Sequence, residues 1–362
     1  MKRLILVLLA VWAGSLVWAQ EEAAEEESAL QISGSVDTYY KYDFGQTSGN
    51  IPTSFAGDHN SISIGMLDLV LEKSTGKASF LAEIAFGPRN AGSAGPASGF
   101  STSVVTPETD STTGTSSIFS SDFAPRIQNL YVSYALTEKL SVTAGYMGTF
   151  VGYEIISPTG NFNYSTSYLF TNGPFQNAGV KLDYAISDKV GVMVGVFNPW
   201  NVYSADPEIG PSSFGAQLYL SPVDGWDVYV NGVTGGESGS EVDLTTTFQL
   251  TDDFMLGVNA AYYNDGADEA GTFAGAAAYL NYALTDGAAI GLRYENFQSN
   301  FVLADVDASV NSFTLSANLG NGAITFIPEV RYDMASEEIF FDADGAGSTS
   351  AMQALIAAVY AF

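Results

Sequence analysis

Cysteine is absent from the 362 residues, and histidine occurs only once, as His59. Without cysteine the chain has no disulfide framework and no residue for an N-terminal lipid anchor. A lone histidine at a loop boundary is a poor candidate for the base of a hydrolase. P-loop, GxGxxG, HExxH and CxxC motifs are missing, and Asp342 to Gly345 lacks the later glutamate of a calcium loop. We therefore predict no enzyme, no cofactor and no metal site.

Basic residues are scarce as well. Beyond Lys2 and Arg3 the chain has 10 of them against 40 acidic residues. Such an excess of acid argues against phosphate neutralisation, and with it against nucleic acid as a partner. After the first nineteen residues there is also no apolar run of about 18 residues, so a transmembrane helix is not expected.

The first nineteen residues have the layout of a secretory signal peptide. Lys2 and Arg3 precede an apolar core, and residues 17–19 resemble a cleavage site before Gln20. An uncleaved anchor is the alternative interpretation. Residues 20–29 are an acidic lead-in that we expect to be a disordered periplasmic spacer, and residues 30–362 are expected to form one domain.

The chain does contain many short segments in which apolar and polar residues alternate. It is 46% apolar and holds 20 tyrosines, 23 phenylalanines and 37 glycines. Alternation with one apolar face is typical of a strand that separates lipid from water. In one segment the phase slips at Gly65-Met66, which predicts a β-bulge. The predicted strands are 30–42, 61–73, 78–86, 127–136, 140–149, 177–186, 190–198, 213–221, 226–234, 241–250, 254–264, 272–284, 288–298, 309–319, 323–334 and 351–362.

The connections between these segments alternate strictly between short and long. Seven are tight turns, and eight are mostly longer: 43–60, 87–126, 150–176, 199–212, 235–240, 265–271, 299–308 and 335–350. An even number of strands places both termini on the side of the tight turns. This pattern predicts an all-β, transmembrane antiparallel β-barrel of 16 strands with short periplasmic turns and long external loops. A soluble β-sandwich and a barrel-anchored adhesin or receptor acting through its loops are the alternatives.

The third long connection, residues 150–176, has seven aromatic residues and one charge, Glu154. Counting residues 164–170 as a spanning strand would give seventeen strands and break the alternation, so we predict that the connection folds into the barrel lumen and narrows it. Glu154 either faces basic wall residues or makes a hydrogen bond within the loop. The candidate constriction residues are Tyr153, Glu154, Phe162, Tyr164 and Tyr168.

The polar face of each strand should point into the lumen. Acids exceed bases in this set, which predicts a weak cation preference, since acidic rings favour cations. The alternative is that Lys181–Asp183, Arg293–Glu295 and Glu329–Arg331 pair along their strands and hold the wall. The predicted pore-wall charges are Asp37, Lys41, Glu83, Lys181, Asp183, Asp243, Arg293, Glu295, Glu329 and Arg331, with Asp333 beside them.

The last strand ends on an aromatic residue. Phe362 is preceded by Tyr360 and by apolar residues at every second position. This pattern resembles the signal that the barrel assembly machinery of the outer membrane reads. We therefore expect assembly by that machinery and lipid of the bacterial outer membrane around the barrel.

Several motifs carry a resemblance to a known family. They are Gly152-Tyr153-Glu154, residues 163–167 (NYSTS), Pro174-Phe175 followed by Gly179, and Asn198-Pro199-Trp200. Together with the layout they resemble the OmpL-like β-barrel porins of Gram-negative outer membranes, although the chain departs from the family's pattern at Asn177 and Asn201. The resemblance implies a passive diffusion channel for small hydrophilic solutes and ions. Porin trimers are common, so a homotrimer stays open.

Overall fold

The computed structural model describes residues 28–91, 126–235, 237–267, 271–304 and 306–362. The predicted signal peptide and nearly all of the acidic lead-in lie outside these residues. The elements are β1 (Gln31–Asp43), β2 (Ser61–Thr75), β3 (Ala78–Phe86), η2 (Pro88–Ala91), β4 (Arg126–Ala135), β5 (Leu140–Gly148), η4 (Pro158–Gly160), α2 (Tyr168–Asn172), β6 (Gln176–Ser187), β7 (Val190–Phe197), β8 (Ser213–Leu220), β9 (Trp226–Gly235), β10 (Gly239–Gln249), β11 (Phe254–Asn264), β12 (Thr272–Thr285), β13 (Ala288–Ser299), β14 (Ala308–Asn321), β15 (Ile324–Ala335), β16 (Phe340–Phe341), β17 (Gly347–Ser348) and β18 (Ser350–Ala361).

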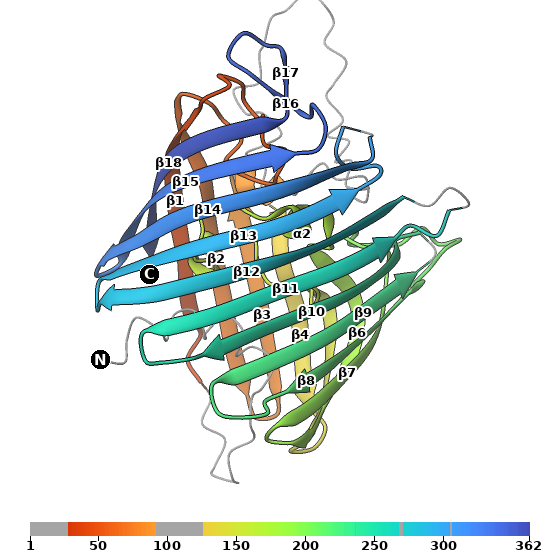
Figure 1. Cartoon of the computed structure of the whole chain (residues 1–362). Coiled ribbons are helices and arrows are strands. Elements are labelled where there is room, and N and C mark those ends of the chain that lie inside the picture. Colours follow the sequence, from red (N-terminus) through yellow and green to blue (C-terminus); the bar gives the residue numbers. More distant parts are fainter. Residues whose placement is uncertain (1–27, 92–125, 236, 268–270, 305) are drawn as a thin grey trace, which may run out of the picture.

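Sixteen of these strands form one closed antiparallel sheet, in which each strand pairs with its neighbours in the chain and β18 pairs with β1 (Figure 1). The small hairpin of β16 and β17 lies outside that sheet, in the last long connection, so β15 pairs directly with β18. The prediction of a 16-stranded barrel is confirmed, and the strands begin and end within a few residues of the predicted limits. Within the described ranges, no helix has the length and apolarity that a membrane span requires.

Both ends of the barrel sheet lie on the side of the tight turns, as the even strand count requires. The Ser28 hydroxyl donates to the carbonyl of Ser74, beside the first tight turn, at 2.6 Å. The backbone N–H and carbonyl of Phe362 bond to Gly34 at 3.0 and 3.1 Å, which closes the last rung between β18 and β1. Tyr360 and Phe362 are exposed on the outer face. Their role in assembly stays a prediction.

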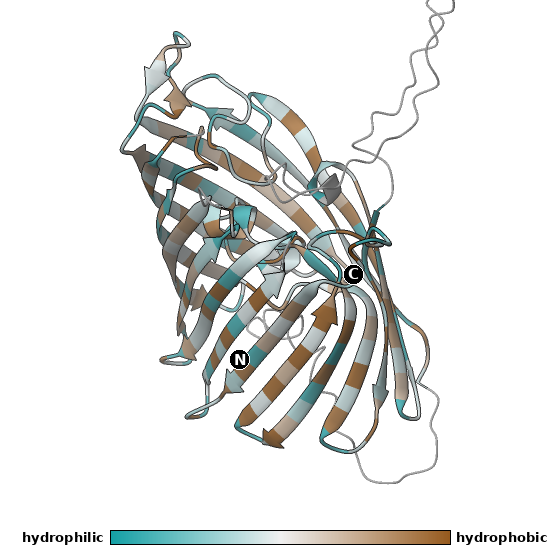
Figure 2. Ribbon diagram, turned by 90° about the vertical axis from the view of Figure 1, so that its right-hand side faces the viewer, coloured by the Kyte–Doolittle hydropathy of each residue, from teal (hydrophilic) through white to brown (hydrophobic). Residues whose placement is uncertain are grey.

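The alternating pattern separates the two faces of the wall. On β6 the side chains of Val180, Leu182 and Tyr184 point outward and are 49%, 40% and 46% exposed. Lys181 and Asp183 lie between them and point into the lumen. Figure 2 shows the same alternation of apolar and polar residues along many strands. The outer face can therefore contact lipid chains while the inner face supplies polar groups.

The predicted β-bulge is present, and it gives the lumenal Asp37 carboxylate a backbone hydrogen bond. The register between β1 and β2 shifts between Val36 and Thr38, opposite Gly65-Met66. The shift allows the Met66 N–H to donate to Asp37 Oδ1 at 2.8 Å. A Cβ added to Gly65 would lie 1.7 Å from Asp37 Oδ2, so this position has no room for a side chain.

We expect Gly65→Ala to destabilise the barrel by about 1–3 kcal/mol, because the new methyl group must displace the buried Asp37 carboxylate. The effect is measured as the urea concentration at which half of the refolded protein is unfolded. The folded fraction is read from the difference in gel mobility between heated and unheated samples. Gly232→Ala is the matched control, since a Cβ at Gly232 meets nothing within 4 Å. Equal midpoints for the two variants would contradict the prediction.

Candidate functional site

Residues 150–176 leave β5 and return to β6 within the barrel (Figure 1). The two ends of the segment meet at the wall, where the Thr149 N–H donates to the Phe175 carbonyl at 3.0 Å. Asn201 Oδ1 accepts the N–H groups of Phe175 and Gln176 at 2.9 and 3.0 Å. Asn201 has a left-handed φ of 62°, which asparagine tolerates well. The predicted lumenal position of this third long connection is confirmed.

Glu154 links the segment to the wall and to itself. Its Oε1 accepts from Arg293 Nη1 on β13 at 2.6 Å, and its Oε2 accepts the N–H and hydroxyl of Ser167 at 2.7 and 2.8 Å. Both interpretations of Glu154 therefore hold. The two charged side chains are only 3% and 1% exposed, so neither presents its charge to open water. The expected pair of Arg293 with Glu295 is wrong, because Arg293 reaches inward to Glu154 instead.

Two wall glutamates accept backbone N–H groups of the segment. Glu295 on β13 accepts from Tyr168 and Leu169 at 2.9 and 2.8 Å, in the first turn of α2. Glu329 on β15 accepts from residues 164 and 165 at 2.8 and 3.1 Å. The N–H groups of a first helical turn have no partner within the helix, so a carboxylate is a suitable acceptor for them. These two side chains hold the middle of the segment against the wall.

Arg331 on β15 makes a further anchor. Its Nη2 lies 2.9 Å from Asp333 Oδ2, so the expected pair with Glu329 is wrong, because Glu329 is occupied by the segment. Arg331 Nη1 donates to the Thr166 carbonyl at 2.8 Å, and the guanidinium lies 5.1 Å from the Tyr168 ring. The Tyr168 hydroxyl donates to Asp333 at 2.7 Å. Burial raises the pKa of Tyr168 well above its ordinary value, so this phenol keeps its proton.

Tyr164 connects the segment to β1, which is separated from β15 by β18 alone in the closed sheet. Its hydroxyl donates to Asp37 Oδ2 on β1 at 2.5 Å. Arg89 in η2 lies over the Tyr164 ring at 4.5 Å and donates to the carbonyls of Tyr164 and Ile156 at 3.1 and 3.2 Å. The sequence predicts residues 87–126 as one of the long external loops. Its start is instead η2, with Arg89 buried in the lumen, while residues 92–125 lie outside the described structure.

The first external loop, between β1 and β2, also braces the segment. The Ser54 N–H donates to Thr171 Oγ1 at 2.8 Å, and the Thr166 hydroxyl donates to the Ser54 carbonyl at 2.7 Å. The Phe55 ring lies 5.9 Å from the ring of Phe170. The constriction is therefore built from two loops and η2.

The five predicted constriction residues all lie in the lumen, but they pack against the wall. Tyr153 stacks on Tyr279 of β12 with ring centroids 4.2 Å apart. The Phe162 ring occupies the space beside Gly291 of β13, where a Cβ would lie 2.3 Å from a ring carbon. The other two aromatics, Tyr164 and Tyr168, are fully buried. The aromatic groups therefore fix the position of the segment as well as adding bulk.

Two further predicted wall charges are buried. Asp243 on β10 accepts the Gly152 N–H at 3.1 Å and the amides of Asn231 and Asn259 at 2.6 and 2.5 Å. Lys41 on β1 is only 2% exposed. Asp243, together with Asp37, Arg293, Glu295, Glu329 and Arg331, holds the segment along β10, β1, β13 and β15.

Three predicted wall charges stay partly accessible, and they lie on β3 and β6. Lys181 pairs with Asp183 at 3.2 Å as predicted, and their side chains are 17% and 21% exposed. Glu83 is half-buried and accepts a hydrogen bond from Asn129 on β4. The remaining water-accessible charge of the predicted set is therefore concentrated on one side of the lumen.

Sequence reasoning missed the roles of Arg89, Ser54 and Asn201. Arg89 stands outside any alternating segment, and Ser54 is one of several small polar residues in a loop, so neither carries a pattern. The role of Asn201 could have been predicted from the sequence, because this residue directly follows the motif Asn198-Pro199-Trp200. The Trp200 ring is buried, and this places Asn201 at the neck of the segment.

Comparison with known proteins gives a family and a set of similar folds. Residues 29–362 match the family described as beta-barrel porin-2, OmpL-like. No curated protein matches the chain at a significant level. Similar solved structures include the outer membrane channel DcaP of Acinetobacter baumannii (15% identity, 96% of this chain and 100% of that one, TM-score 0.58). The anion-selective porin of Comamonas acidovorans has 11% identity, covers 93% and 100% of the two chains, and gives a TM-score of 0.59. OmpT of Vibrio cholerae, in its trimer form, has 12% identity, 92% and 99% coverage, and a TM-score of 0.56.

We expect Glu154→Gln and Arg293→Gln each to destabilise the barrel by about 3–5 kcal/mol, because each leaves one buried charge without its partner. The double variant buries neither charge and should recover much of that loss. Urea midpoints measure the stability, and single-channel current noise in planar bilayers should rise in the single variants as the segment loosens.

Lys181→Gln is the control for this cycle. Its ion pair with Asp183 is partly exposed, and such a pair contributes at most about 1 kcal/mol. If the Glu154 and Arg293 variants unfold at the same urea concentration as Lys181→Gln, the buried pair does not hold the segment.

Proposed function

The chain belongs to the beta-barrel porin-2, OmpL-like family and is a protein of the bacterial outer membrane, and from this premise we propose a passive diffusion channel for small hydrophilic solutes and ions with a weak cation preference. The family and the similar folds support a porin and not an enzyme. The observation that carries the proposal is the course of residues 150–176, which enter the lumen and stay there.

A size-limited channel needs a narrowing that keeps its position. The segment meets this need through charged and backbone contacts to β10, β13, β15 and β1. The accessible pair of Lys181 and Asp183 supports a passage on the other side of the lumen, along β3 to β6. Solutes would cross beside the segment, between its surface and this part of the wall.

The weak cation preference is proposed from the distribution of accessible charge. Arg89, Arg293 and Arg331 are buried among protein groups, and so are the wall acids beside them. The partly accessible remainder of the predicted wall set is two acids, Glu83 and Asp183, and one base, Lys181. Acids in the external connections are exposed and raise the local cation concentration at the mouth. They include Asp206, Glu208, Glu337, Glu338, Asp342 and Asp344.

Residues 1–19 would direct export, residues 20–29 would form a spacer, and the exposed Tyr360 and Phe362 would be read by the barrel assembly machinery. Small solutes and ions are the proposed cargo. A homotrimer is the oligomer to test, and its presence would not change the route through a single barrel.

We expect replacement of residues 151–173 by an Asn-Gly turn to raise single-channel conductance severalfold, because it removes the narrowing. The design is feasible since Thr149 and Phe175 are already hydrogen-bonded at 3.0 Å. Planar bilayer recordings measure the change, and retained heat-modifiable gel mobility confirms folding. A folded variant with unchanged conductance would contradict the constriction, and a wild-type barrel without conductance would favour the anchor interpretation.

We expect Asp183→Asn to lower the cation-to-anion permeability ratio and Lys181→Gln to raise it, each by about twofold, because their charges lie beside the passage. The reversal potential under a salt gradient measures the ratio. Glu138→Gln, in a tight turn and exposed, is the control for charge outside the lumen. A zero or anion-type potential for the wild-type protein would overturn the cation preference.

A further inference from the structure

Glu241 on β10 carries a buried carboxylate for which the described part of the fold supplies no partner. Its side chain points into the lumen, because the residues directly opposite on β9 and β11 are the buried Val233 and Tyr263. Glu241 is 3% exposed, and its Oε2 has no hydrogen-bond partner. Among the described residues, no basic side chain forms an ion pair with it. An ionised carboxylate in this setting is strongly unfavourable, so a proton or a cation must neutralise it.

Asp243 adds a second negative charge to the same face of β10. It lies two residues beyond Glu241 and accepts hydrogen bonds from the Gly152 N–H and from the amides of Asn231 and Asn259. These donors are all neutral, and no base in the described ranges forms an ion pair with Asp243. The inner face of β10 therefore presents two negative charges that no described base balances.

The Glu241 carboxylate faces the C-terminal end of α2. Glu295 accepts N–H groups at the start of this helix, which is a favourable place for a carboxylate. At the other end, the N–H of the C-cap residue Gly173 donates to the Leu169 carbonyl at 3.0 Å. The last carbonyls of a helix have no partner within it and carry partial negative charge. A second acid at this end is therefore unfavourable unless a positive charge lies between the two.

Gly173 leaves room for such a charge. A Cβ added to Gly173 would lie 3.5 and 3.7 Å from the two carboxylate oxygens of Glu241, and 3.4 Å from the Leu169 carbonyl oxygen. Three oxygen atoms thus border one small space. Gly173 has φ −80° and ψ 176°, a conformation that any residue adopts. The backbone does not require glycine here, whereas the space beside the three oxygens does.

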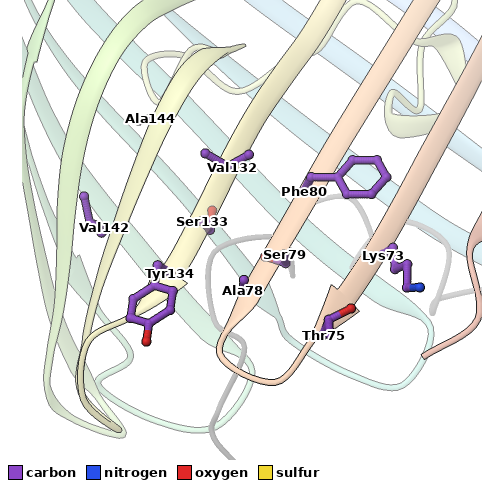
Figure 3. A pocket seen from close by; sticks show the side chains of 10 residues that line it. All are labelled: Lys73, Thr75, Ala78, Ser79, Phe80, Val132, Ser133, Tyr134, Val142 and Ala144. Atoms are coloured by element: carbon purple, nitrogen blue, oxygen red, sulfur yellow. The ribbon is translucent and has the colours of Figure 1, made fainter. Parts of the chain in front are cut away.

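The depression on the outer wall across β2 to β5 is a different kind of space (Figure 3). It has a volume of about 450 Å³, and the side chains of Phe80, Val132 and Val142 form apolar parts of its lining. None of the side chains that line it is acidic. The oxygen-lined space beside Gly173 is therefore the better candidate for a cation.

We propose that Glu241 and the Leu169 carbonyl bind a divalent cation of the calcium class at the C-terminal end of α2, with Asp243 supplying the second negative charge. Carboxylate and carbonyl oxygens are the ligands that calcium prefers, and calcium accepts water and irregular geometry in the rest of its shell. Among the described residues, no three acidic, histidine or cysteine side chains gather around one point. The site therefore depends on backbone oxygen and water, and we expect a dissociation constant of about 10⁻⁴ to 10⁻³ M.

The cation would hold the second end of the helix that Glu295 holds at the first. Glu241 is the third residue of β10, next to the long connection 235–240, so the site lies toward the external mouth. Divalent ions of the external medium would thus stabilise the narrowing. This role rests on the lumenal position of residues 150–176 and does not depend on which ions the channel prefers.

Terbium(III), which replaces calcium and emits light when a nearby indole is excited, tests binding to the refolded full barrel. The Trp200 ring lies 5.5 Å from the ring of Tyr263, the residue opposite Glu241. We expect terbium emission that calcium displaces. Glu241→Gln should weaken terbium binding about tenfold, because it removes the charged ligand. Glu337→Gln, an exposed acid of the last external loop, is the control and should leave the emission unchanged.

Unfolding in urea tests the same site without a luminescent ion. We expect calcium chloride to raise the urea midpoint of the wild-type barrel by about 0.5 M relative to sodium chloride of equal ionic strength. Glu241→Gln should have the same midpoint in both salts. Gly173→Ala fits at ordinary contact distances but fills the space between the oxygens, so it should fold and lose the calcium response. It tests the site even if Glu241→Gln fails to fold.

Equal midpoints of the wild-type barrel in the two salts would overturn the proposal, since Glu241 would then be neutralised by a proton. A calcium response or terbium emission that Glu241→Gln retains in full would overturn it as well. Heat-modifiable gel mobility shows that each variant is folded. Neither measurement uses current through the pore, so failure here leaves the channel proposal standing, and a barrel without conductance would leave the cation site standing.

Discussion

Every polar group that residues 150–176 carry into the lumen needs a partner there, because an unpaired buried N–H or carbonyl is strongly unfavourable. The wall provides these partners with charged side chains. Glu295 and Glu329 accept backbone N–H groups, while Arg293 and Arg331 donate to the carbonyls of residues 165 and 166. The path of the segment, the burial of the wall charges and the narrowing of the lumen all depend on this matching.

The same matching shapes the electrostatics of the channel. Charges used to hold the segment are surrounded by protein, so they contribute little to the field that a solute meets. The accessible remainder of the predicted wall charges lies on β3 and β6, and exposed acids are also present in the external loops. A count of charges along the strands therefore overstates the number of groups that face the passage, for acids and bases alike.

The two faces of the wall are in contact with different surroundings. Inside, strands alternate to offer hydrogen-bonding groups to a folded loop. Outside, they offer apolar side chains to lipid, and Lys73 is the one charged exception among the described strands.

The sequence by itself determined the barrel. Alternation with period two, the spacing of tight turns and the slip at Gly65-Met66 led to the strand count, the two faces and the bulge, because these features depend on residues close together in the chain. Only the tertiary structure decided the ion pairs. Glu154 meets Arg293 across 139 positions, and Arg89 reaches Tyr164 across 75. Such pairings follow from the curvature of the closed wall and from the route of the segment through it, and neither is encoded in a local pattern.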